Sequence, residues 1–176
     1  MEIRKYQPSD LEGCMQLMQS NIPEYFQESD LADFARFLTN LPCVFFVAID
    51  CEAGMVACGG IGLGKKTATE AVLCYGMVAG SQLRKGIGKE LLRKRLEAFL
   101  PQEPQVQFLT VNTTQKTEGF FRRFGFAVVE REPDGFGPGL DRVSLTATKS
   151  DVVRLLDENA VSKLKPPQPH LEHPGG

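Results

Sequence analysis

Alternating polar and apolar residues open the chain, and helical spacing follows them. Residues 2–6 alternate in this way and predict a strand. The segment 8–10 (PSD) offers helix-start chemistry ahead of a first apolar helical face. After a break at 21–23, apolar residues recur at helical spacing from Leu31 and stop near Pro42. The first quarter of the chain therefore predicts one strand and two helices.

Longer apolar runs dominate the middle of the chain. They predict strands over 44–49, 55–63 and 68–78. From Ile87, apolar residues recur at helical spacing as far as Phe99, with charged residues on the other face, which is the clearest helix in the sequence. The remaining pattern predicts a strand over 106–112, a helix over 115–124 closed by Gly125, and strands over 126–130 and 142–146. This order predicts a mixed α/β fold.

The composition changes after residue 148. A short helical pattern over 152–156 gives way to a Pro-rich segment and a Gly-Gly end, which favours disorder. With 176 residues, 42% of them hydrophobic, the chain can bury one core but hardly two. We therefore expect one domain over 1–148, followed by a short helix and a disordered tail over 149–176.

Charge and hydropathy exclude several classes of partner. A formal net charge of -2 and a pI near 5.8 provide no general attraction to nucleic acid or to anionic lipid. The basic stretch 84–95 would need more net positive charge around it to bind DNA or RNA. No apolar run approaches the roughly 20 residues of a membrane span, and the N-terminal segment lacks a signal peptide's apolar stretch. These features predict a cytoplasmic protein without a nucleic-acid or membrane partner.

The cysteines and histidines limit the chemistry further. The five cysteines include no C-x-x-C pair, which argues against a disulfide framework and a zinc ribbon. The only two histidines, His170 and His173, lie in the Pro-rich tail. The body of the chain therefore has neither a Ser-His-Asp triad nor a histidine-built metal site, and we expect no metal.

One segment has the chemistry of an anion site. The predicted strand over 71–78 is followed by a polar loop and then by the sequence RKGIGK over 84–89, which opens the long helix. Amides at a helix start and the helix dipole both favour a phosphate there. Gly86 and Gly88 lack the Cβ atoms that would keep a pyrophosphate from the backbone, and three cations lie beside them.

Two common phosphate motifs do not match this segment. A Walker A loop needs a glycine at position 83 and a hydroxyl at position 90, where the chain has Leu83 and Glu90. The dinucleotide fingerprint needs a third glycine or an alanine where Leu91 stands, and repeated βαβ units do not follow. An ordinary tight loop remains the alternative to a phosphate site.

Two motifs together resemble the GNAT family of N-acetyltransferases. The turn Gly86-Ile87-Gly88 is similar to that family's R/Q-x-x-G-x-G/A pyrophosphate loop. The segment 119–126 (GFFRRFGF) is similar to its F-Y-x-x-x-G-F segment, and the order of predicted elements over 1–147 also matches. The resemblance implies a central mixed, largely antiparallel, twisted sheet of about seven strands flanked by about four helices.

The resemblance also implies a reaction and a set of binding residues. Acetyl-CoA would lie in a split between two strands and pass its acetyl group to a primary amine of a small molecule or peptide. The residues implied for acetyl-CoA are the strand end Met77 and Val78, the loop Arg84, Lys85, Gly86, Ile87, Gly88 and Lys89, and Thr114 and Phe121 at the thioester.

The chain departs from the family pattern at three positions. Leu83 stands where Arg or Gln is usual, which removes one side-chain donor but no backbone amide. Thr114 stands where the family often has Asn. Phe121 replaces the tyrosine that often protonates the departing thiolate, so that acid is missing at this position. Either no acid is needed, because a CoA thiol is a fairly good leaving group, or another residue supplies the proton.

Residues on the strand over 68–78 are the candidate acid and base. Glu70 shares a strand face with Val72 and Cys74 and is a candidate general base, although a solvated strand-start glutamate is an equal alternative. Tyr75 is a candidate acid, with simple packing as the favoured alternative. Cys74 has no histidine to activate it, so we expect direct transfer without an acyl-enzyme.

The acceptor is less well specified. Acidic and aromatic residues over 24–33 suit a cationic amine, but such a run is usually a solvated face. The Gly/Pro-rich segment 132–141 is expected to be a long loop that covers the acceptor pocket. An acyl-CoA-binding regulatory module without efficient catalysis is the alternative function, and the sequence leaves a homodimer open.

Overall fold

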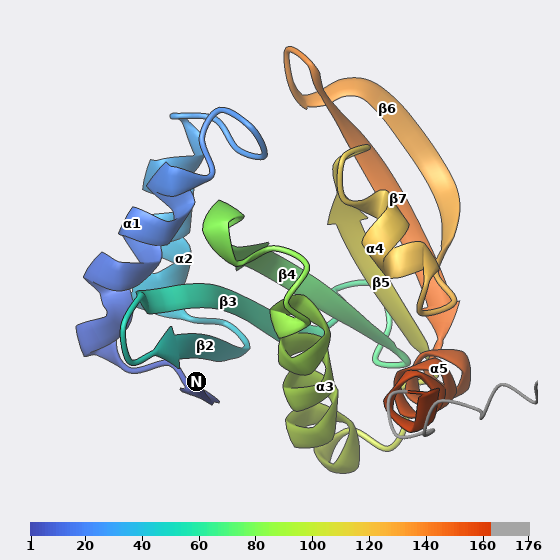
Figure 1. The fold of residues 1–176 in the computed structure, drawn as a ribbon. Helices are drawn as coiled ribbons and strands as arrows, with labels where there is room; N and C mark the ends of the chain where they lie inside the picture. Colours follow the sequence, from blue (N-terminus) through green and yellow to red (C-terminus); the bar gives the residue numbers. More distant parts are fainter. Residues whose placement is uncertain (163–176) are drawn as a thin grey trace, which may run out of the picture.

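The computed structural model describes residues 1–162, with side chains through residue 158, and it contains one seven-stranded sheet (Figure 1). The strand order is β1-β2-β3-β4-β5-β7-β6. The strands are β1 (Glu2–Lys5), β2 (Val44–Asp50), β3 (Gly54–Leu63), β4 (Glu70–Val78), β5 (Phe108–Thr113), β6 (Ala127–Gly137) and β7 (Leu140–Thr148). All neighbours pair antiparallel except β4 and β5, which are parallel. The mixed, largely antiparallel seven-stranded sheet predicted from the sequence is confirmed.

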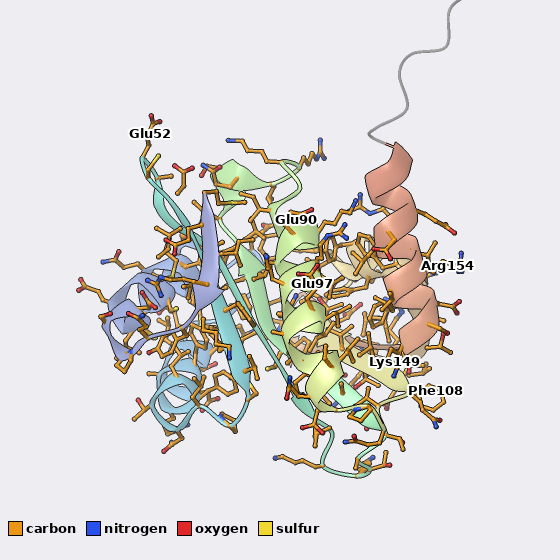
Figure 2. The ribbon with its side chains drawn as sticks, turned by 90° about the horizontal axis from the view of Figure 1, so that it is seen from below. Glu52, Glu90, Glu97, Phe108, Lys149 and Arg154 are labelled. Atoms are coloured by element: carbon orange, nitrogen blue, oxygen red, sulfur yellow. The ribbon has the colours of Figure 1, made fainter. Side chains whose placement is uncertain are left out.

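Helices cover both faces of the sheet. They are α1 (Leu11–Ser20), α2 (Asp30–Asn40), α3 (Ile87–Phe99), α4 (Glu118–Arg122) and α5 (Lys149–Ser162). Successive residues of β2 enter different cores: Val47 packs with α1 and α2, whereas Phe46 and Ala48 pack with α3. Because side chains alternate along a strand, α1 and α2 lie on one face and α3 on the other. Figure 2 shows α3, with Glu90 and Glu97, beside α5.

The parallel pair β4–β5 is joined over only half of its length. Pairing runs from Glu70 opposite Phe108 to Leu73 opposite Val111 and then stops. Beyond these residues the two strands separate, and Figure 1 shows them meeting near α5 and diverging upward. The sheet is thus split at the carboxyl ends of β4 and β5.

A β-bulge turns β4 at the start of this split. Cys58 pairs with Met77 and Gly60 pairs with Cys74, so Gly59 alone faces both Tyr75 and Gly76. Tyr75 takes a left-handed backbone conformation with φ 46°. An extra residue in one strand bends that strand and increases its local twist. The bulge therefore accounts for the departure of β4 from the line of β5.

The prediction of a long loop over 132–141 is wrong. β6 and β7 continue through it as a hairpin, with Glu132 opposite Arg142 and Gly137 opposite Leu140. The pairing is irregular between Glu132 and Gly137, and Asp134 and Gly139 have positive φ. Because β6 is an edge strand, Pro133 does not break a ladder on both sides, which is where proline is tolerated in a sheet.

The bounds of two helices differ from expectation. α4 is shorter than 115–124 because Gln115 instead holds the hairpin, through its amide to the Gly139 carbonyl and its carbonyl to the Asp141 amide. α5 is longer than 152–156 and buries Val152 and Leu156 in the main core. The expected disorder of the tail beyond residue 162 lies outside the described residues.

Candidate active site

A pocket of about 450 Å³ lies where β4 and β5 separate. β4 lines it with residues 72–78 and β5 lines it with residues 111–113, followed by Thr114. Gly88, Leu91 and Arg95 contribute from α3. The pocket therefore passes through the split in the sheet and reaches α3.

The start of α3 lies at one end of this pocket. Gly86 is its N-cap in the left-handed conformation, with φ 81°, which glycine adopts without the cost that a Cβ would add. Among the described residues, no side chain caps this helix, so its first-turn amides are available to an anion. Arg84 and Lys85 precede it, and Leu83 and Gly88 line the pocket. This geometry suits an anion, and the phosphate site itself stays a prediction.

The structure gives a packing reason for glycine at position 88 that the sequence did not indicate. A Cβ at this position would lie 3.3 Å from the ring of Phe120, on α4, and 3.7 Å from Val78. Gly88 therefore lets α4 pack closely against the start of α3. The two motifs singled out in the sequence, around residues 86–88 and 119–126, thus lie close together.

The ends of β4 and β5 leave backbone groups available. From Cys74 to Val78 the edge of β4 that faces β5 has no strand partner, while its other edge pairs with β3. Unpaired backbone donors and acceptors of a strand bind an extended ligand well. Met77 and Val78 both line the pocket, and their role in holding the arm of a thioester cofactor stays a prediction.

Thr114 and Phe121 also line the pocket, on the β5 side. Both are buried. The Thr114 hydroxyl lies 3.3 Å from the Thr117 hydroxyl and accepts a hydrogen bond from the Lys116 amide, so it helps turn the chain from β5 into α4. Phe121 packs edge-on against Phe120 and Phe126. Of the positions predicted for the cofactor, the lining residues of the pocket therefore include Met77, Val78, Gly88, Thr114 and Phe121 but not Arg84, Lys85, Gly86, Ile87 or Lys89. Thr114 and Phe121 contribute shape more than hydrogen bonding.

Tyr75 lies in the pocket at the bulge. Its ring packs against Phe34 and Phe37 of α2, with centroids 4.8 and 4.6 Å away. Burial raises the pKa of Tyr75 above its ordinary value of 10.0, and Asp33 and Asp30 raise it further. The phenol is therefore protonated at neutral pH and its ring is held in place.

Glu70 lies at the opposite end of β4, seven residues from Met77, which is roughly 23 Å along an extended strand. It is next to Gly64, where a Cβ would be 2.7 Å from its carboxylate, and it does not line the pocket. The face shared with Val72 and Cys74 does lead to the pocket, but Glu70 is too far along it. The structure does not bring this candidate base to the site.

The other end of the pocket is formed by the segment between α1 and α2 and by the β6–β7 hairpin. Tyr25, Phe26 and Asp30 line it from one side and Phe136 from the other. Gln27 contacts Gly137, where a Cβ would be 1.5 Å from its amide nitrogen. Asp30 is the one carboxylate among the lining residues of the described chain. Its Oδ2 accepts a hydrogen bond from the backbone amide of Gln27 at 2.8 Å. The sequence indicated this acidic segment but did not single out Asp30.

Arg95 is the lining residue that the sequence analysis missed. It lies in the otherwise apolar stripe of α3, four residues after Leu91, and is only 3% exposed. A charged residue at a core position was the available signal. Burial lowers the pKa of Arg95 from its ordinary value to about 10, so the guanidinium is still charged at neutral pH.

Two thiols lie near the bulge. The sulfurs of Cys43 and Cys74 are 3.7 Å apart, and the hydrogen bond between them lowers the pKa of Cys74 and raises that of Cys43.

Residues 1–158 contain no group of three or more His, Cys, Asp or Glu side chains that could hold a metal ion. None of the helices described in the structure is long and apolar enough to cross a membrane.

Comparison with known families agrees with this geometry. The family model described as an acetyltransferase (GNAT) domain matches residues 43–143, which is more than half of the chain. The chain belongs to the GNAT acetyltransferase family. Its family and its fold together make it an acyltransferase. The match contains the split strands, the start of α3 and α4, whereas the α1–α2 segment that lines the other end of the pocket precedes it.

Solved structures share the GNAT fold. A putative GNAT-family acetyltransferase from Desulfovibrio desulfuricans superposes with a TM-score of 0.69 at 18% identity, over 84% of this chain and 98% of its own. An aminoglycoside 6'-N-acetyltransferase complexed with coenzyme A gives 0.67 at 16%, over 84% and 97%. A ribosomal-protein-alanine N-acetyltransferase from Brucella melitensis gives 0.65 at 20%, over 84% and 99%. No curated protein sequence matched the chain.

Proposed function

We propose that this GNAT enzyme transfers an acetyl group from acetyl-CoA to a primary amine of a small molecule or peptide by direct attack. The observation that carries the proposal is the continuity of the site. One pocket joins the uncapped N-terminus of α3 to the unpaired edge of β4 and then to an acidic, aromatic end. A long thioester cofactor with phosphates at one end and a reactive acyl group at the other fits this order of groups.

The residues at the start of α3 would hold the pyrophosphate. The amides of residues 86–89 and the helix dipole favour its negative charge, and the side chains of Arg84, Lys85 and Lys89 add positive charge at the same end. The backbone of Met77 and Val78 would bond the pantetheine arm, because this edge of β4 has no other strand to pair with. The complex of the aminoglycoside 6'-N-acetyltransferase with coenzyme A supports this assignment.

Direct transfer needs a proton acceptor and a proton donor. The amine nitrogen attacks the thioester carbonyl carbon, the carbon–sulfur bond breaks, and the sulfur leaves with the electron pair of that bond. We assign the proton donor to the hydroxyl of Tyr75, which lines the pocket and has a raised pKa. Asp30, the carboxylate at the acidic end, accepts the amine proton directly or through water. Tyr75 thus supplies the acid that Phe121 lacks, and Asp30 takes the place of Glu70 as the base.

The acceptor is assigned from the acidic end of the pocket. Asp30 provides negative charge, and Tyr25, Phe26 and Phe136 provide aromatic surface, which together suit a cationic amine. Most other acidic groups nearby are paired: Glu24 with Lys116, and Asp33 with Arg36. The names of two structural neighbours, one acting on an aminoglycoside and one on a ribosomal-protein alanine, support both small-molecule and peptide amines.

A pair of variants at one position tests the cofactor site. Asn and Asp both tolerate the left-handed conformation that Gly86 adopts, and they have nearly the same shape. Only Gly86→Asp adds a negative charge where the pyrophosphate is placed. By calorimetric titration of acetyl-CoA, we expect Gly86→Asp to bind at least ~10-fold more weakly than Gly86→Asn. Equal binding by the two folded variants would contradict the assignment.

An acyl-CoA-binding regulatory module remains the second candidate, because Phe121 occupies the position where the family often has its acid. Acceptor-dependent release of CoA across a panel of amines separates the two. Turnover that depends on the amine supports the transferase, whereas acyl-CoA binding without turnover of any amine in the panel supports the module. The cytoplasmic location and the homodimer stay predictions.

A further inference from the structure

Arg95 is a buried cation that has no carboxylate partner among residues 1–158. The guanidinium donates one hydrogen bond, from Nη1 to the Gly60 carbonyl at 3.3 Å, and its Nε has no partner. No carboxylate among residues 1–158 pairs with it. An isolated buried charge is costly unless something pairs with it. The residue also lines the pocket, so a ligand in the pocket can reach it.

The protein makes room for this side chain at the bulge. A Cβ on Gly59 would lie 3.0 Å from Nη1, and a Cβ on Gly76 would lie 3.4 Å from it. The guanidinium therefore sits in the hollow that these two glycines leave between α3 and the bend of β4. It is held where the split in the sheet begins, beside Cys74 and Leu91 of the pocket wall.

The position of Arg95 along α3 excludes the pyrophosphate as its partner. Arg95 is eight residues after Ile87, which is about 12 Å along the helix. The uncapped amides and the cations of the phosphate site are at the start of that helix. The group that reaches Arg95 therefore belongs to the part of the ligand farthest from the phosphates, near the reacting centre.

We propose that Arg95 binds a carboxylate that the substrate brings into the pocket and so selects substrates that carry one. This inference rests on the proposed acyl transfer and specifies the substrate class. Arg is suited to this role because its planar fork of donors matches a carboxylate in two parallel hydrogen bonds. The carboxylate supplies the charge and the acceptors that the guanidinium lacks in the free protein.

Two substrates could bring this carboxylate. The acyl group itself carries one in malonyl-CoA or succinyl-CoA, and with acetyl-CoA as the donor it would belong to an amino-acid acceptor. Arg95 projects from α3, on the face of the sheet opposite the α1–α2 segment that forms the acidic end. The acidic Asp30 also disfavours an anionic group at that end. The geometry therefore favours the acyl group as the source.

Matched pairs of thioesters test whether the acyl donor supplies the carboxylate. Malonyl-CoA and propionyl-CoA differ by a carboxylate in place of a methyl group, as do succinyl-CoA and butyryl-CoA. By calorimetric titration of the whole chain, we expect at least one carboxylate-bearing thioester to bind ~10-fold or more tightly than its methyl partner. We expect Arg95→Met to remove this preference and Arg95→Lys to keep only part of it.

Matched amines test the acceptor as the source. With acetyl-CoA as donor, β-alanine is compared with propylamine, and 5-aminopentanoate with pentylamine, by amine-dependent CoA release. A preference of ~10-fold or more in kcat/KM for a carboxylate-bearing amine, lost in Arg95→Met, supports the acceptor as the source. Wild-type protein that shows no carboxylate preference in either arm overturns the proposal.

Two controls separate the possible failures. Arg93→Met changes an arginine of the same helix that pairs with Glu90 and Asp157 outside the pocket, and it should keep the wild-type preference. The affinity for CoA itself should be unchanged in Arg95→Met. If wild type does not bind CoA, the proposed function fails. If CoA and butyryl-CoA bind but no carboxylate is preferred, only the inference about Arg95 fails. The comparison of carboxylate-bearing and methyl substrates with wild-type protein tests the proposal even if Arg95→Met does not fold.

Discussion

The two ends of β4 belong to the same strand and do different things. At the first end, Glu70 to Leu73 pair with β5 on one side and Ala71 to Leu73 pair with β3 on the other, and Ala71 and Leu73 are buried in the main core. At the second end, Cys74 to Val78 pair only with β3, and they line the pocket. The paired end holds the two halves of the sheet together, whereas the split end leaves backbone and side chains available to a ligand.

The comparison shows how a small local irregularity produces a binding site. On the N-terminal side of the bulge, neighbouring strands pair with the backbone groups on both edges of β4, so none remains for a ligand to bond. On the C-terminal side, the bend separates β4 from β5, and the freed edge faces the pocket. The same bulge provides the hollow for Arg95 and positions Tyr75. Changes at the two ends should therefore affect different properties.

The largest effect is expected for a truncation at the paired end. Leu109 of β5 is fully buried there, opposite Ala71. Leu109→Ala should lower the free energy of unfolding by about 2–5 kcal/mol, because it removes apolar contacts and leaves a cavity. Urea unfolding measures this cost. Acetyl-CoA affinity below the unfolding transition should stay within about threefold of wild type, and a selective loss of affinity would break the division between the two ends.

At the split end, removal of one oxygen should affect turnover instead of stability. Tyr75→Phe keeps the ring packed against Phe34 and Phe37, so stability should change by less than about 0.5 kcal/mol. The value of kcat should fall ~100-fold or more if the phenol is the proton donor.

The pH dependence of kcat has a definite sign for this donor. Because the pKa of Tyr75 is raised above 10.0, the hydroxyl stays protonated through neutral pH, and on the alkaline side of the profile wild-type kcat should fall only as the pH rises above that pKa. An unchanged kcat in Tyr75→Phe would leave packing as the role of this residue.

A smaller effect is expected at the acidic end of the pocket. Asp30→Asn keeps an oxygen that can accept the hydrogen bond from the Gln27 amide, but it removes the negative charge. KM for a cationic amine should rise by about tenfold and kcat should also fall, because an amide cannot accept the amine proton, while the affinity for acetyl-CoA should not change. Steady-state kinetics and calorimetry measure the two separately. Parallel losses in both would mean that the variant has distorted the pocket as a whole.

The smallest effect is expected for Glu70→Gln, at the paired end of β4. The carboxylate is next to Gly64 and outside the pocket, so kcat and KM should stay within about twofold of wild type. Side by side with Tyr75→Phe, this variant compares the two ends on a single strand. A large loss of kcat would restore Glu70 as a base and contradict its placement away from the reacting groups.

Much of the fold could be read from local patterns. The helical spacing from Ile87 to Phe99 gave α3 with the bounds that the structure has, and Gly125 does close α4 with φ 87°. The hairpin over 132–141 could not be read in this way. Its glycines and proline favour a loop locally, and only pairing with β7 at the sheet edge makes it a strand.

Residues for the cofactor end could also be predicted, because a helix start that suits a phosphate is local in sequence and combines glycines, cations and helix-forming residues within a few positions. Positions such as Glu70 could not be decided from strand periodicity, since periodicity gives the face of a strand but not where the pocket ends along it. The same limit hid Asp30, which reaches the pocket through the packing of the α1–α2 segment against the hairpin.

The sequence by itself determined the family, the order of elements and the helix start that suits a phosphate, because each depends on residues that are neighbours along the chain. Only the tertiary structure decided where the sheet splits and what faces the split. Gly59 and Gly76, on different strands, meet to make room for Arg95 from a helix on one face, while Tyr75 and Asp30 lie toward the other. Such a site depends on contacts between segments far apart in the sequence, and no local pattern encodes which of them will meet.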